Sequence, residues 1–313
     1  MPQPSDSASG LFFDFSQRLK LRLSGGDVFR FLNGQITNDL KKATTDSSIQ
    51  ASVLNAKGKL NAVVVVNVDG DTSFLLDSDS DVAGELPARI ERYIIADDVQ
   101  IEDVTSRFGI FHVIATTERL PDSISAWKIV RAIRFRQPGW DIWFEHTKRE
   151  PLFAEFSRRW TFCDEDCAEL LRIEQGIPRW GRELTGEIIP TEANLESISI
   201  DYAKGCYIGQ EVISRIKSSG QTNKRLCGFV SISGEPLRPG MYLTTNDGEN
   251  REVGWITSAR HSPRLNQQLA LGYAKRGYFD EGARFRALSS SDPADAPGIP
   301  IEVVALPFIQ TLA

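Results

Sequence analysis

One cysteine within a short run of glycines is the residue best placed to do chemistry in this sequence. Cys206 lies in the segment Lys204-Gly205-Cys206-Tyr207-Ile208-Gly209-Gln210-Glu211, and the apolar spacing beyond Gly209 predicts a helix that begins just after it. Free N–H groups and the positive end of the dipole at such a helix terminus favour a thiolate. Lys204 is two residues away, so in an extended chain its ammonium shares a face with the thiol. These features predict a reactive Cys206 assisted by Lys204; the alternative is a small core cysteine in a glycine turn.

The same octapeptide closely resembles the K-G-C-Y-x-G-Q-E signature of the YgfZ family of folate-binding proteins, which share the fold of the glycine-cleavage aminomethyltransferase. Four further segments resemble blocks of that family, in the family's order: Phe31–Asp39, Leu54–Lys59, Arg172–Pro178 and Ile189–Leu195. The resemblance implies a bound tetrahydrofolate or folate derivative. It also implies a role in the assembly or repair of iron–sulfur clusters in partner enzymes and, through such enzymes, in tRNA modification.

The resemblance also implies which side chains act. Cys206 and Lys204 are the catalytic candidates. The candidates for folate binding are Asn55, Asn61, Arg172, Gly205, Tyr207, Gln210, Glu211 and Arg215. Arg172 falls on an arginine that contacts folate in the related transferases; the alternative for it is a surface helix arginine paired with Glu169 or Glu174. Arg215 belongs to a basic cluster with Lys217, Lys224 and Arg225, which could meet a polyglutamate tail or an RNA phosphate, or form a solvated helix end.

Two departures from the family pattern argue against aminomethyltransferase activity. Where those enzymes carry an acidic pair, this chain has Asn61 and Ala62, whose side chains cannot move a proton or stabilise an iminium-like charge. The segment Gln137–Asp141 stands where they carry G-Y-T-G-E, and it lacks that Glu. The predicted function is therefore folate-assisted support of iron–sulfur enzymes. The alternatives are an active folate-dependent aminomethyltransferase and a non-catalytic folate-binding adaptor.

The apolar patterns predict an α+β fold around these motifs. Strands are expected over residues 11–23, 49–54, 60–68, 72–76, 99–104, 109–115, 127–135 and 140–145, and helices over about 80–95, 151–160 and 164–175. From Arg225 onward, short strands alternate with Gly, Pro and Asn/Asp turns, which is typical of a β-barrel. We therefore expect a disordered tail over 1–10, a folate-binding region of two intimately joined α+β subdomains over 11–225, and a barrel domain over 226–313. By resemblance, these lobes form a three-lobed ring around a central cavity.

Composition narrows the remaining classes of function. The chain has 313 residues and a net charge of −6, and its longest apolar run is Ala62–Val66, so neither a duplex nucleic-acid binder nor a membrane-spanning protein is expected. Met1–Gly10 lacks the basic and apolar regions of a secretory signal, which predicts a cytoplasmic protein. Cys163 and Cys167 are predicted to be free structural thiols, because no further ligand completes a zinc site, and Cys227 is predicted to lie in the core. No resident metal is expected. The expected partners are folate and iron–sulfur enzymes or cluster-assembly proteins, and direct binding of nucleic acid is not expected.

Overall fold

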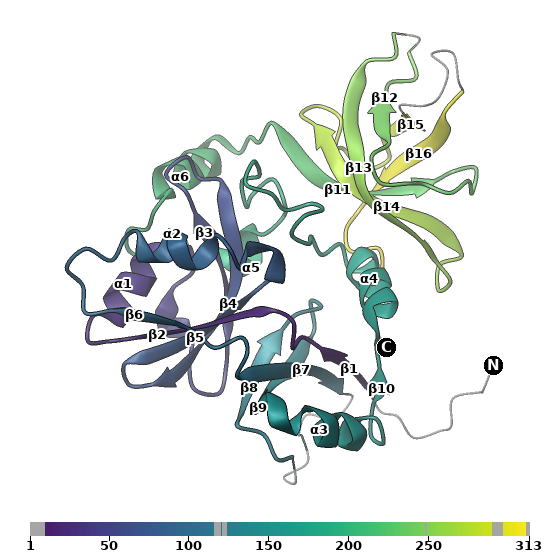
Figure 1. Ribbon diagram of the computed structural model, residues 1–313. Coiled ribbons are helices and arrows are strands. Elements are labelled where there is room, and N and C mark those ends of the chain that lie inside the picture. The colour runs from purple at the N-terminus through teal and green to yellow at the C-terminus, as the bar shows by residue number, and fades with distance from the viewer. Residues whose placement is uncertain (1–9, 116–119, 121–123, 248, 290–296, 311–313) are drawn as a thin grey trace. The chain divides into compact units, whose positions relative to one another are not determined.

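The alternating apolar segments of the N-terminal half form strands, as their spacing predicts. The computed structural model describes residues 10–115, 120, 124–247, 249–289 and 297–310. The chain divides into two units (Figure 1). The first unit comprises Met1–Ala56, Asn61–Ala168 and Ile198–Gln210, and the second comprises Lys57–Leu60, Glu169–Ser197 and Glu211–Ala313. The predicted domain boundaries stay a prediction, and most of the predicted tail lies outside the described residues.

Two five-stranded sheets build the first unit. One sheet has the order β10 (Thr161–Phe162), β1 (Gly10–Asp14), β7 (Phe108–Ala115), β9 (Pro138–Glu145) and β8 (Lys128–Ile133). The other has the order β3 (Ile49–Leu54), β4 (Leu60–Gly70), β5 (Ser73–Ser78), β2 (Leu19–Ser24) and β6 (Gln100–Asp103). Apart from the parallel β1–β10 pair, the strand pairs of the first sheet are antiparallel.

Alternation along β9 gives the first sheet two apolar faces. Ile142 and Phe144 point to one face and pack in a cluster with Leu152 and Phe156 of α3 (Arg149–Phe156). Trp143 points to the other face and packs in a cluster that includes Leu75 of β5. The second face therefore joins the two sheets through a shared core.

Short helices complete the first unit. They are α1 (Val28–Gln35) and α2 (Leu86–Glu91), with 3-10 turns at Leu40–Lys42, Ser80–Val82 and His146–Lys148. The four-residue α5 (Glu196–Ser199) begins in the second unit and ends in the first. The helix predicted over 80–95 is thus shorter than expected, because a 3-10 turn and Gly84 precede α2. Pro87 lies in the first turn of α2, as predicted.

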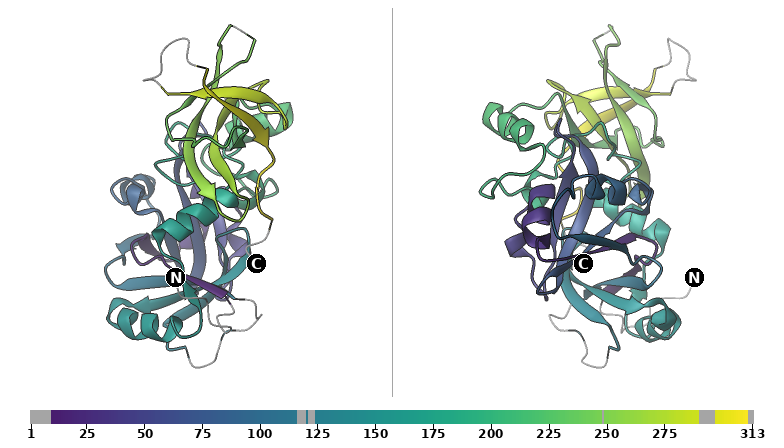
Figure 2. Two further views of the ribbon diagram at one scale, coloured as in Figure 1. Left: turned by 90° about the vertical axis from the view of Figure 1, so that its right-hand side faces the viewer. Right: turned by 60° about the vertical axis from the view of Figure 1, so that its left-hand side comes forward.

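The second unit contains a closed barrel, which Figure 2 shows from two sides. Its strands follow the order β11 (Lys224–Ser231), β14 (Gln267–Lys275), β13 (Glu252–Ser262), β12 (Tyr242–Thr244), β15 (Arg284–Leu288) and β16 (Ile299–Val304). Alternate side chains such as Phe229, Leu243 and Ile256 fill the interior. The predicted fold class, α+β with a C-terminal β-barrel, is confirmed.

Two helices, α4 (Glu165–Glu174) and α6 (Gln210–Ser219), carry candidate site residues. As predicted, α4 ends at Gly176, whose φ of 63° is left-handed. The N–H of Ile177 donates to the carbonyl of Arg172 and the N–H of Gly176 to that of Ile173, which is the Schellman pattern. Gly209, with φ of 85°, turns the chain into α6 as expected.

Candidate functional site

The loop Lys204–Gly209 leads into α6 and packs against the C-terminal end of α1. The N–H of Ile208 donates to the carbonyl of Gly34 over 3.2 Å. Before this anchor, Gly205 and Cys206 are exposed, and a Cβ added to Gly205 would meet no atom within 4 Å. The loop therefore presents the Cys206 thiol at the surface, and the alternative of a core cysteine is wrong.

Lys204 is bonded to backbone carbonyls at the end of α1. Its Nζ donates to the carbonyls of Asn33 (2.6 Å), Ile36 (2.7 Å) and Asn38 (2.8 Å). Ile36 is the C-cap of α1, so the ammonium lies at the negative end of the helix dipole. All three N–H groups are used, and burial lowers the pKa of Lys204 to about 8. Lys204 thus fixes the loop on α1; its predicted effect on Cys206 stays a prediction.

The remaining residues of the octapeptide differ in exposure. Tyr207 is buried with its ring 5.3 Å from the Lys204 Nζ, and desolvation raises the pKa of Tyr207 to about 12. Gln210 is half-buried at the start of α6, while Glu211 and Arg215 are exposed and share one helix face. Tyr207 therefore belongs to the packing of the loop, whereas Glu211 and Arg215 are accessible. Their role in folate binding stays a prediction.

Arg172, predicted to contact folate, lies in a buried network of the second unit. Its five N–H groups donate to Glu169 (2.5 and 2.7 Å), Glu183 (2.9 Å), Ser258 (2.6 Å) and the carbonyl of Ile177 (3.3 Å). The alternative of an exposed helix arginine is wrong, since only 5% of Arg172 is exposed, although its pairing with Glu169 is confirmed. Every donor of the guanidinium already has a protein acceptor, so a ligand would have to displace one of them.

Glu183 is the fully buried centre of that network. Its Oε1 accepts from the hydroxyls of Thr257 (2.7 Å) and Ser258 (2.6 Å), and its Oε2 accepts from Arg172 and from the N–H of Arg179 (3.0 Å). Glu174, the other predicted partner of Arg172, instead accepts from the hydroxyl of Ser262 (2.5 Å). These bonds give the network a structural role in the second unit.

Asn61 and Ala62, which by resemblance stand where the transferases carry acids, lie at the start of β4 in the first unit. Ala62 is fully buried, while Asn61 is half-buried and its Oδ1 accepts from the Nε of Arg89 over 3.3 Å. Arg89 also donates to the Oε1 of Gln35 (2.9 Å) and to the carbonyl of Leu54 (2.6 Å). Asn55, half-buried, follows Leu54 directly. Sequence analysis missed Arg89 and Gln35, because neither stands in a pattern with Asn61.

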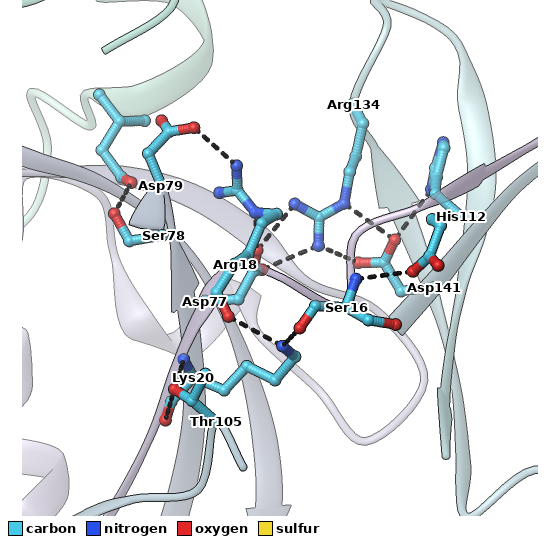
Figure 3. A network of polar contacts seen from close by, with 12 residues as sticks. Ser16, Arg18, Lys20, Asp77, Ser78, Asp79, Thr105, His112, Arg134 and Asp141 are labelled. Atoms are coloured by element: carbon cyan, nitrogen blue, oxygen red, sulfur yellow. Dashed lines mark hydrogen bonds and ion pairs between the residues drawn. The ribbon is translucent and has the colours of Figure 1, made fainter. Parts of the chain in front are cut away.

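The sequence analysis also missed a buried ionic network in the first unit (Figure 3). Arg134 donates to Asp77 of β5 (2.8 Å) and to Asp141 of β9 (2.6 Å), and so links the two sheets. Asp77 also accepts from Arg18 (2.5 Å), and Asp141 lies 2.8 Å from the Nδ1 of His112. Burial opposes the charge on both carboxylates, but Arg134 outweighs it and holds their pKa values below the usual range. Burial lowers the pKa of His112. Because Asp77, Asp141 and His112 are at most 2% exposed, this network holds the sheets together rather than binding a ligand.

Cys163 and Cys167 form a disulfide, so the prediction of two free thiols is wrong. Cys163 lies two residues before α4 and Cys167 lies in its first turn, which brings their Cα atoms to 5.3 Å. The carboxylate of Asp164 accepts from the N–H of Cys167 (2.9 Å) and starts the helix. Cys227 is buried in the barrel as predicted, and burial raises the pKa of its thiol to about 11.

The described residues lack two further kinds of feature. No three or more of their His, Cys, Asp and Glu side chains are grouped so that they could hold a metal ion. No helix in that part of the chain is long and apolar enough to cross a membrane.

Known proteins resemble this chain in both fold and sequence. Residues 224–310 match the family model of the glycine cleavage T-protein C-terminal barrel domain. The crystal structure of glycine cleavage system aminomethyltransferase T from Bartonella henselae superposes with a TM-score of 0.83 at 17% identity, over 97% of this chain and 87% of that one. The fold is therefore that of the T-protein-like class.

Proteins of similar sequence show which members of the T-protein-like class this chain resembles. A tRNA-modifying protein YgfZ of Aliivibrio fischeri is 28% identical over 76% of this chain and 77% of its own length. An iron–sulfur cluster assembly factor IBA57 homolog, mitochondrial, of Dictyostelium discoideum is 27% identical over 67% of this chain, and the match spans 60% of that relative. An aminomethyltransferase of Aquifex aeolicus is 35% identical, but over 43% of this chain and 36% of its own length. These relatives and the barrel match confirm the resemblance to the YgfZ family of T-protein-like proteins that the octapeptide implies.

Proposed function

We propose that this protein binds tetrahydrofolate or a derivative in the cytoplasm and supports the assembly or repair of iron–sulfur clusters in partner enzymes, and through them tRNA modification. The observation that carries the proposal is the exposed Cys206 on a loop anchored to α1. A thiol held at the surface can reach a group on another protein, which a core cysteine cannot. The relatives that are named as a tRNA-modifying protein YgfZ and as an iron–sulfur cluster assembly factor support the same function.

In the loop, Lys204 and Ile208 hold the backbone in place and Cys206 supplies the reactive group. Lys204 fixes the backbone through three carbonyls, and Ile208 adds a fourth bond, so that Cys206 is presented with little backbone freedom. Thiolate sulfur is a ligand for iron–sulfur clusters, and a cluster would be cargo borne by the partner rather than a resident group. Cys206 would then bind or exchange with such a cluster during repair.

The polar side chains of the first unit fit a folate. Asn55 and Gln210 are half-buried, so their amides can meet N–H and carbonyl groups of a pterin while remaining reachable from solvent. A bound tetrahydrofolate supplies one-carbon or reducing chemistry. Arg172 is left out of the proposed ligand contacts, because its donors are all used within the second unit.

Folate binding is tested by thermal melting of the full chain with and without tetrahydrofolate. A ligand at about 100 times its Kd stabilises the native state by about 2.7 kcal/mol, which is readily measured. Absence of both a melting shift and a calorimetric heat would remove folate from the proposal.

The role of the thiol is tested by complementation of a bacterial strain that lacks its own YgfZ relative. Wild type, Cys206→Ser and the control Cys227→Ala are compared by the activity of an iron–sulfur enzyme under oxidative stress. We expect Cys206→Ser to fail and Cys227→Ala to restore activity. Full activity of Cys206→Ser would favour the alternative of a folate-binding adaptor, and turnover with a lipoyl carrier protein and tetrahydrofolate would favour the aminomethyltransferase.

A further inference from the structure

Arg89 of α2 is a half-buried cation without a counter-ion. Arg134 and Arg172, which are more deeply buried, each pair with two carboxylates. Arg89 forms no ion pair with a carboxylate of any described residue. Burial lowers the pKa of Arg89, and the ionisable neighbours that act on it are Tyr93 and Arg92, neither of which is a carboxylate. Burying a charge without a counter-ion is costly, so an anionic ligand would stabilise the guanidinium of Arg89.

The polar groups of Arg89, Asn61 and Gln35 that lack a partner among the described residues are all hydrogen-bond donors. Three of its five N–H groups donate to the oxygens of Asn61, Gln35 and Leu54. The other two, one on Nη1 and one on Nη2, have no acceptor within the part of the chain that the structure describes. Because a guanidinium has no acceptor, it turns both amide oxygens toward itself, and the NH₂ groups of Asn61 and Gln35 remain as further donors without an acceptor among those same residues.

The guanidinium is also held in one orientation. Its carbon lies 4.3 Å from the centre of the Tyr93 ring, so one face is covered by a cation–π contact. Gln35 is buried at the last position of α1, next to the Gly34 carbonyl that anchors the Cys206 loop. The same helix turn therefore positions both the thiol loop and the donors around Arg89, all within the first unit.

We propose that Arg89, Gln35 and Asn61 form a binding site for the carboxylate of a small organic ligand. A single positive charge with two free guanidinium N–H groups matches a planar, singly charged group with two oxygens. A phosphate dianion would leave charge and oxygens unmatched at a site with one cation. The carboxylate can belong to the glutamyl part of a folate, in which case the site deepens the proposed function, or to a free amino or dicarboxylic acid.

The experiment titrates the full chain with three probes: tetrahydrofolate, tetrahydrobiopterin (a reduced pterin without a carboxylate) and glutamate. Arg89→Gln removes the charge and the fork, and Arg92→Gln, an exposed arginine three residues later, is the matched control for net charge. We expect Arg89→Gln to weaken binding of a carboxylate-bearing probe by about 10- to 100-fold, the worth of a charge-assisted hydrogen bond. Arg92→Gln should change it less than twofold. Arg89→Gln also removes the donors of three hydrogen bonds, so its melting temperature is measured first and binding is compared at a temperature where the variant is folded.

The three probes distinguish failure of the carboxylate site from failure of the proposed folate binding. Weakened tetrahydrofolate binding with unchanged tetrahydrobiopterin binding assigns the site to the glutamyl carboxylate. Glutamate binding that Arg89→Gln abolishes supports the site even if tetrahydrofolate does not bind at all, in which case folate fails and the site stands. The proposal is overturned if Arg89→Gln binds tetrahydrofolate and glutamate as the wild type does, if both variants weaken binding equally, if tetrahydrobiopterin is affected as strongly as tetrahydrofolate, or if no carboxylate probe binds.

Discussion

Replacing Arg172 by methionine should destabilise the second unit without changing the affinity for folate. Arg172 bonds to the fully buried Glu183 and to Glu169, whose side chain is 17% exposed. Removal of one partner of a buried ion pair typically costs about 3–5 kcal/mol, and a more exposed pair adds about 0–1 kcal/mol. We therefore expect a loss of about 3–5 kcal/mol, because the carboxylate of Glu183 would remain buried with only hydroxyl and amide donors.

A double-mutant cycle with Glu183→Gln tests this origin. Each single variant should be destabilised in urea unfolding at pH 7, whereas Arg172→Met combined with Glu183→Gln should lose at least 1 kcal/mol less than the sum, since no unpaired charge at Glu183 then remains buried. Additive losses would mean that the pair is not the source of the effect.

The functional half of the same prediction uses calorimetric titration of the folded variant with tetrahydrofolate. We expect a Kd within twofold of the wild type, because no N–H of Arg172 is free for a ligand. A variant with wild-type stability but tenfold weaker binding would refute the structural reading and return Arg172 to the folate site.

Three further predictions concern polar groups and the disulfide. Lys204→Met should cost about 2–4 kcal/mol in urea unfolding at pH 7, because three carbonyls lose a donor worth about 1 kcal/mol or more each. The pKa of Lys204 is about 8 in the folded protein and 10.5 in the unfolded chain, so between these values the unfolded chain binds more protons. The free energy of unfolding of wild type relative to Lys204→Met should therefore grow from pH 8 to 10.5. Wild-type stability should fall below about pH 6.5, because the unfolded chain protonates His112 while the buried imidazole resists. It should fall further below about pH 4, because the unfolded chain then protonates Asp141 while the folded protein keeps this carboxylate charged; a melting temperature flat from pH 7 to 4 would contradict the first step. Replacing Cys163 and Cys167 together by serine should cost about 2 kcal/mol, the loop-closure entropy of a five-residue ring, and a thiol count of four in wild type unfolded without reductant would show that the pair is reduced.

The sequence predicted helix ends, most strands and the barrel, because short segments of sequence determine these features. The glycine at Gly176 ends α4 and Gly209 starts α6, because each takes a positive φ that other residues avoid. Alternation located most strands and the turn-rich C-terminal third identified the barrel. The length of the helix before β6 was overestimated, since apolar spacing alone does not register the break at Gly84.

The partners of the charged residues could not be predicted in this way. Lys204 meets carbonyls that lie 166 to 171 positions earlier, and Arg134 meets Asp77 over 57 positions. Nothing in the sequence near Arg172 distinguishes an arginine that binds a ligand from one bonded to Glu183 and Ser258. Those pairings depend on which strands lie side by side, and that is a property of the whole fold.

The charge at Arg89 bears on why this chain departs from the aminomethyltransferases. Their acidic pair can favour an iminium-like cation, whereas Asn61 here is neutral and accepts from a guanidinium at 3.3 Å. Two unit charges about 4 Å apart repel by about 4 kcal/mol at an effective dielectric of 20, which is close to three orders of magnitude in a rate. A cation forming beside Asn61 would therefore be opposed by Arg89 as well as left unassisted by the lost acids. The same charge favours an anionic group at this place, as the carboxylate site proposed around Arg89 requires.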